Sequence, residues 1–124
     1  MEKITLNNGI VVEVEDKTVV LSGDLYMIHQ EFTTVVKLSE KDSDLKRYCG
    51  GDLLRKTRVF KKSAVHERNL EEAKVAMKDS YLASTIPYLE HPKFVSCFKK
   101  RCLEEFREQE EKARLRMSGH EERE

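Results

Sequence analysis

The spacing of apolar residues changes once along this chain, from alternation in the first half to a repeat of three to four in the second. Leu25–Leu38 is the longest alternating segment, with Tyr26, Ile28 and Phe32 among its apolar positions. Alternation places side chains on opposite faces of a strand, whereas a spacing of three to four places them on one face of a helix. The sequence therefore predicts strands first and helices afterwards.

Three further strands are predicted by the same reasoning. Lys3–Leu6 and Ile10–Glu15 flank an Asn-Asn-Gly sequence, and these residues tolerate the positive φ of a tight hairpin turn. Leu21–Asp24 is predicted to be a turn, and Leu54–Val65 a strand. The polar segment between the last two strands has room for a short helix near residues 44–48, closed by one of two glycines.

The first long helix is predicted to begin at Asn69, because Asn69 with Glu72 forms a capping pair. Its apolar stripe runs from Leu70 to Tyr88, and we expect it to end or kink before Pro87. Pro92 suits the first turn of a second helix. The apolar stripe of that second helix comprises Phe94, Phe98, Cys102 and Phe106.

These elements predict an α+β fold, with an antiparallel sheet of about four strands followed by two helices packed on one face. A chain of 124 residues is expected to form one domain. We place that domain at residues 1–118 and predict a disordered tail over residues 119–124.

The charges balance in total but not along the chain. Lys and Arg number 23, as do Asp and Glu, so the clear basic excess of a nucleic-acid-binding protein is absent. Residues 54–66, however, hold five basic side chains and no acidic one: Arg55, Lys56, Arg58, Lys61 and Lys62. Alternation places Lys56, Arg58 and Lys62 on one face with Phe60, and Arg55 and Lys61 on the other.

Two interpretations of this basic strand remain open. Its cations can pair with acidic side chains of neighbouring strands, or protect a sheet edge. Alternatively, they can contact a polyanion such as nucleic acid, or an acidic protein partner.

The cysteines and His91 do not have the spacing of a metal site. Cys97 and Cys102 are five residues apart, which places them about 140° apart around a helix. His91 precedes Pro92, where we expect it to cap the bend. Cys49 is expected to be the most accessible thiol, although nothing in the sequence positions a base beside it. We predict no metal, no cofactor and no catalytic residue.

An enzymatic alternative would use His29 and Glu31, which share a strand face, or Cys49. His66 and Glu67 lie at the end of another predicted strand, which could bring them near His29. Without a second motif to fix these groups, an exposed polar face is the simpler interpretation.

Location is predicted from what the sequence contains at its start and in its thiols. The first residues, MEKITLNNGI, lack the apolar core of a secretion signal, and no apolar run is long enough to cross a bilayer. Three irregularly spaced cysteines do not form a disulfide framework. We therefore expect a cytoplasmic protein with reduced thiols.

Several turn and joint motifs resemble an uncharacterised family of small bacterial proteins of this length. They are Asn8-Gly9 in the first hairpin, Ser22-Gly23-Asp24, Pro87-Tyr88-Leu89, and His91-Pro92 with Phe94. The resemblance covers most of the chain and implies a strand-rich first half, a helical second half and a bacterial cytoplasm. It carries no activity, so no catalytic residue is transferred.

The function predicted from the sequence is a non-enzymatic binding or assembly module that self-associates, as a homodimer, or binds a protein partner. Leu115 and Met117 favour this prediction, because little of the domain remains to cover them. Nucleic-acid binding through the basic strand is the first alternative, and a small enzyme is the second. No membrane partner is expected.

Overall fold

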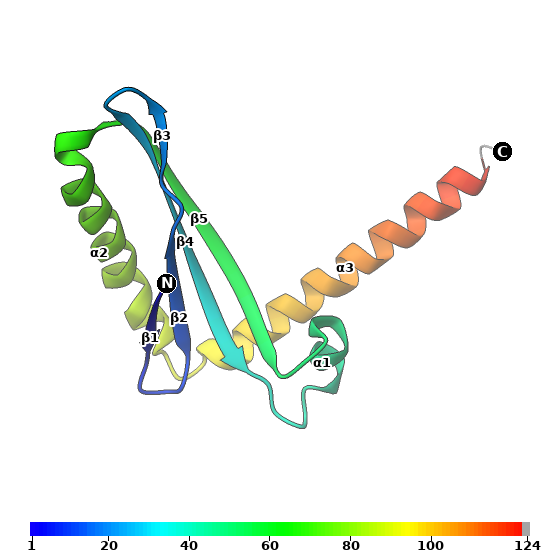
Figure 1. Ribbon diagram of the computed structural model, residues 1–124. Helices are drawn as coiled ribbons and strands as arrows, with labels where there is room; N and C mark the ends of the chain where they lie inside the picture. The colour runs from blue at the N-terminus through cyan, green and yellow to red at the C-terminus, as the bar shows by residue number, and fades with distance from the viewer. Residues whose placement is uncertain (123–124) are drawn as a thin grey trace.

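The structure is a computed structural model that describes residues 1–122, with side chains described as far as residue 117 (Figure 1). Its strands are β1 (Glu2–Thr5), β2 (Val11–Asp16), β3 (Val19–Ser22), β4 (Leu25–Lys37) and β5 (Leu53–His66). Its helices are α1 (Ser43–Cys49), α2 (Leu70–Leu89) and α3 (Phe94–Glu122). The predicted α+β class is confirmed, with five strands in the antiparallel sheet.

β4 is the central strand of the sheet. β2 pairs with its residues 30–35 and β3 with its residues 25–27, so β2 and β3 follow one another along one side of β4. β5 pairs with the other side over the whole length of β4. The sheet therefore ends in the short β1 beside β2 at one edge and in the 14-residue β5 at the other.

The core lies on the face of the sheet that α2 covers. Ile28, Phe32 and Val36 of β4 point to this face and are buried, as the alternation predicts. The ring of Tyr81 on α2 stacks on Phe32 with 4.0 Å between centroids. The other face carries no helix and is held by ion pairs, among them Arg55 with Glu13.

α3 packs against the rest of the molecule only through its first turns. Phe94 and Cys102 are buried in the main core, and Phe106 stacks on Tyr48 of α1 at 5.1 Å. From residue 107 to residue 117 every side chain is exposed, and the helix extends away from the sheet (Figure 1). Both predicted long helices therefore pack against the core, α3 only as far as Phe106, and the rest of α3 is an exposed extension.

The ends of the helices differ in detail from the prediction. Asn69 makes no capping hydrogen bond; instead, the His66 ring accepts one from the Arg68 amide at 3.2 Å, before a 3-10 turn leads into α2. Pro87 does not end α2, which continues to Leu89. That extra turn buries Leu89 and leaves Tyr88 57% exposed, the reverse of the predicted stripe.

Two loop predictions are confirmed. α1 ends at Gly50, whose φ of 71° is the left-handed conformation that glycine permits, and its amide donates to the Lys46 carbonyl at 2.9 Å. His91 caps the bend before α3, since its ring accepts a hydrogen bond from the Lys93 amide at 3.1 Å. The predicted tail over residues 119–124 remains a prediction, because those side chains and all of residues 123 and 124 lie outside the described residues.

β5 contains one irregularity. The pairing with β4 shifts register between Tyr26 and Ile28, and Ala64 has a φ of 58°. A residue other than glycine in this conformation is uncommon and marks a β-bulge here. The regular part of β5 therefore ends at Lys62.

Candidate binding groove

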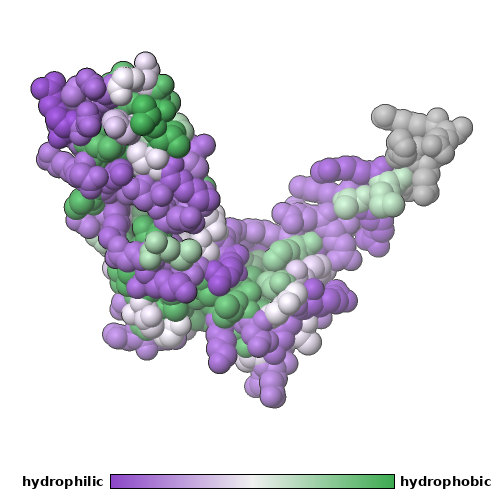
Figure 2. Space-filling model, in the orientation of Figure 1, coloured by the Kyte–Doolittle hydropathy of each residue, from purple (hydrophilic) through white to green (hydrophobic). Residues whose placement is uncertain are grey.

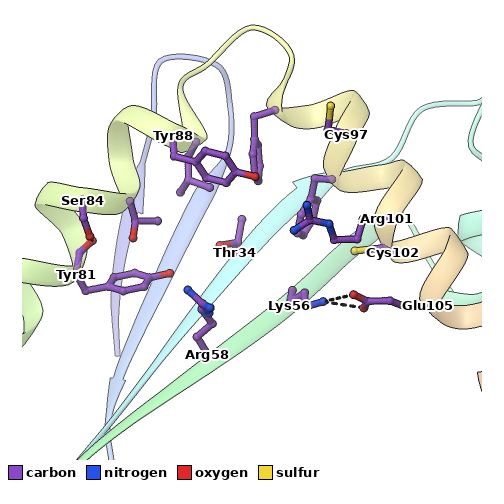
Figure 3. Close-up of a pocket in the computed structure, with 14 residues that line it drawn as sticks. Thr34, Lys56, Arg58, Tyr81, Ser84, Tyr88, Cys97, Arg101, Cys102 and Glu105 are labelled. Atoms are coloured by element: carbon purple, nitrogen blue, oxygen red, sulfur yellow. Dashed lines mark hydrogen bonds and ion pairs between the residues drawn. The ribbon is translucent and has the colours of Figure 1, made fainter.

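A groove of about 470 Å³ separates α2 from α3, and β4 with β5 forms its floor (Figure 3). It exists because α3 leaves the sheet at an angle after the 90–93 bend, while α2 stays on the sheet. Its lining includes Arg58, Tyr81, Tyr88, Phe94, Cys97 and Arg101. Figure 2 shows hydrophobic surface where α3 joins the rest of the molecule.

Two unpaired cations face the groove. Arg58 points upward from β5 and Arg101 points inward from α3 (Figure 3). Neither makes an ion pair within 4.0 Å among residues 1–117. Lys56, by contrast, donates to both oxygens of Glu105 at 2.7 and 2.9 Å. The groove therefore carries an excess of positive charge that the described part of the chain does not neutralise.

Aromatic rings line the other walls. Tyr81 is fixed by stacking on Phe32. Tyr88 meets Phe94 edge-on at 5.1 Å, and Phe94 stacks on Phe98 at 5.1 Å. Such contacts hold ring positions and leave apolar surface next to the two guanidinium groups.

The five cations of the predicted basic strand lie on the two faces of β5 that alternation predicts for them. Lys56, Arg58 and Lys62 lie opposite Thr34, Phe32 and Ile28 on the helix-covered face. Arg55 and Lys61 lie on the other face, where Arg55 pairs with Glu13. Two of the five cations thus form ion pairs within the chain, and the remaining three form none among the described residues.

One prediction about the thiols is wrong. Cys49 is half-buried, whereas Cys97 is exposed and lines the groove, so the expectation that Cys49 is the most accessible thiol is wrong. Burial raises the pKa of the Cys49 thiol, and burial likewise raises the pKa of Cys102. A raised pKa lowers the thiolate fraction and with it the nucleophilicity.

No three metal-ligating side chains gather within the described residues. His91 instead uses one ring nitrogen at the bend, and Cys102 lies in the core.

The structure brings together only some of the side chains that the enzymatic alternative requires. The His29 ring lies 3.0 Å from the Glu31 carboxylate. A hydrogen bond from Lys17 is the main cause that holds the pKa of Glu31 below its usual value. His66 pairs with Leu25 and so lies at the far end of the strand, away from His29. The pair occupies the helix-free face, outside the groove.

A second hollow, between β2 and α2, has both of its lysines in ion pairs. Lys74 pairs with Asp16 at 2.8 Å, and Lys78 pairs with Glu2. The buried side-chain oxygen of Gln30 has no hydrogen-bond partner among the described residues. Because its two lysines are already paired with carboxylates, this hollow has less capacity to attract an anion than the groove.

Sequence reasoning found Arg58 but missed Arg101 and the groove itself. Arg101 precedes Cys102, and its position beside a buried helical stripe is the one signal that could have identified it. Its approach to Arg58, 43 residues earlier, depends on the angle between α3 and the sheet.

Comparison of the chain with protein-family models, with curated proteins and with solved structures finds no match. The resemblance to a small bacterial family therefore stays a prediction. None of the helices in the described residues combines the length and apolarity that crossing a bilayer requires.

Proposed function

We propose that this chain is a non-enzymatic binding module whose ligand places an anionic group in the groove between α2 and α3. The observation that supports this most is the pair Arg58 and Arg101, two guanidinium groups that face one groove without a carboxylate partner among residues 1–117. An anion between them relieves their mutual repulsion and gains charge-assisted hydrogen bonds.

Binding is favoured over catalysis by what else lines the groove. The lining contains no histidine, and Glu105 is already held by Lys56. Cys97 is the exposed thiol there, but the lining offers it no free general base. Tyr81, Tyr88 and Phe94 suit a flat apolar body attached to the anionic group.

An aromatic sulfonate, 8-anilinonaphthalene-1-sulfonate, combines these two features and tests the proposal by its fluorescence. We expect saturable binding to the folded protein that weakens about fivefold in Arg58→Gln and in Arg101→Gln, since each removes one charge-assisted contact. Lys61→Gln is the matched control, because Lys61 lies on the other face of β5. Equal binding by all three variants would contradict the proposal.

Nucleic-acid binding through β5 receives less support. Arg55 and Lys56 are engaged by Glu13 and Glu105, and the three remaining cations are divided between two faces of the sheet. A continuous basic surface with interleaved aromatic rings, as nucleic acid requires, is not formed by these positions.

Self-association is the second candidate function, and the β3 hairpin favours it. Val19, Val20 and Leu21 are 48%, 60% and 48% exposed, and Leu25 adjoins them. Figure 2 shows hydrophobic surface at this end of the molecule. A cluster of exposed apolar residues on one hairpin is typical of an interface. We place the module in the cytoplasm, where its three free cysteines stay reduced.

A further inference from the structure

β5 is a long strand with a free edge. It pairs with β4 on one side, and no other strand pairs with it within the described residues. The backbone groups along its outer side therefore have no strand partner. Such an edge is a template for an added strand.

The side chains beside this edge determine what kind of added strand would fit. Arg58, Lys61 and Lys62 have no carboxylate within 4.0 Å among residues 1–117. Val59 and Phe60, between them, are 47% and 36% exposed. The edge thus offers positive charge on both faces and one apolar side chain on each face.

A second copy of β5 does not fit this edge. In an antiparallel pair of identical strands related by a two-fold axis, two residues that face each other have sequence numbers that are both even or both odd. Centring that axis on Arg58 places it against itself and Arg55 against Lys61, and centring it on Val59 places Lys56 against Lys62. Like charges directly opposite one another destabilise strand pairing.

We propose that the β5 edge binds an acidic, extended segment of a partner protein as an added antiparallel strand. This inference rests on the proposed function, since Arg58 serves both, and it names the partner class. The segment carries acidic residues opposite Arg58, Lys61 and Lys62, and apolar residues opposite Val59 and Phe60.

The peptide TEEVIETT, acetylated and amidated, has this pattern when aligned antiparallel to residues 56–63 and serves as the probe. At millimolar peptide we expect slower amide exchange for backbone groups of residues 57–62, measured by NMR on the full chain. We also expect the affinity to fall as salt is raised. The charge-reversed peptide TKKVIKTT should not bind.

Two further samples separate strand addition from simple charge attraction. Peptides N-methylated at alternate residues, in either of the two phases, keep every charge but lose backbone donors, so at least one phase should lose binding. Lys61→Glu should weaken TEEVIETT about tenfold, whereas Lys41→Glu, an exposed loop control, should not.

Unchanged exchange on β5, or binding of both methylated peptides as tight as that of TEEVIETT, would overturn strand addition. Sulfonate binding that still depends on Arg58 and Arg101 would leave the proposed function standing in that case. If the peptide binds as expected but sulfonate binding does not depend on Arg58 and Arg101, the proposed groove ligand is contradicted instead.

Discussion

Asp42 links the loop before α1 to α3 through one carboxylate. It accepts hydrogen bonds from Lys99 at 2.7 Å, and from the amide and hydroxyl of Ser39 at 2.8 and 3.0 Å. The Lys99 hydrogen bond is the main cause that lowers the pKa of Asp42 below its ordinary value. A carboxyl whose folded-state pKa is depressed stabilises the fold above its unfolded pKa and loses that contribution as the pH falls through the folded one.

We therefore expect Asp42→Asn to lower the free energy of unfolding by about 1 kcal/mol at pH 7. The difference from the unaltered chain should shrink below about pH 4, where the carboxyl protonates. Denaturant titrations between neutral and acidic pH measure it. Asp79→Asn, at an exposed site without an ion pair in the described residues, is the control; a difference for Asp42→Asn that persists at pH 2 would be evidence against this role.

At the scale of elements, α3 has two parts with different dependence on the fold. Its last contact with the rest of the described molecule is the hydrogen bond from the Tyr48 hydroxyl to Glu110, at 2.6 Å. A chain that stops after Lys112 should keep its thermal midpoint within about 3 °C. One that stops after Arg101 loses Cys102, Leu103 and Phe106 from the core, so its midpoint should fall by about 10 °C or more.

Circular dichroism against temperature compares the two shortened chains. Residues beyond Glu110 form a helix without tertiary support, and such short helices are marginal in water. A large loss of stability in the longer of the two chains would mean that the far end of α3 contributes to the fold.

Apolar residues recur at a regular spacing where one face of an element packs against a core, and this spacing is the main signal from which an element can be predicted. β4 was predicted within one residue at each end because its alternate positions meet a core, and β5 was predicted as closely although only its Leu54 and Val65 are buried. β3 was missed because all four of its residues are exposed, so no alternation is imposed. The direction of α3 was also missed, since its apolar stripe establishes a buried face but not how far that face is covered.

The same limit applies to the candidate site. Alternation placed Arg58 on the correct face of β5, but nothing local connects it with Arg101 on α3. That both line one groove is a consequence of tertiary structure. Likewise, the His66 ring makes the capping hydrogen bond in place of Asn69, because a 3-10 turn precedes α2. No sequence pattern predicted that turn.

For the whole molecule, the β3 hairpin gives the test of self-association. Val20 is exposed in the single chain, so Val20→Glu should leave the circular dichroism spectrum unchanged. If two copies meet through this hairpin, the buried charge should convert a dimer to a monomer in sedimentation equilibrium. Lys41→Glu is the control for charge. A strict monomer before the substitution, at high protein concentration, would contradict self-association.

The bulge at Ala64 limits the length over which another strand can pair with the outer edge of β5. Beyond Lys62 the strand bends and its register shifts, so a straight neighbour can follow only the ten residues from Leu53 to Lys62. Open-ended stacking of sheets into filaments needs a long, flat, uncharged edge, and this one is bent and cationic. The chain can thus leave one side of its sheet open to a partner without becoming a seed for its own polymerisation.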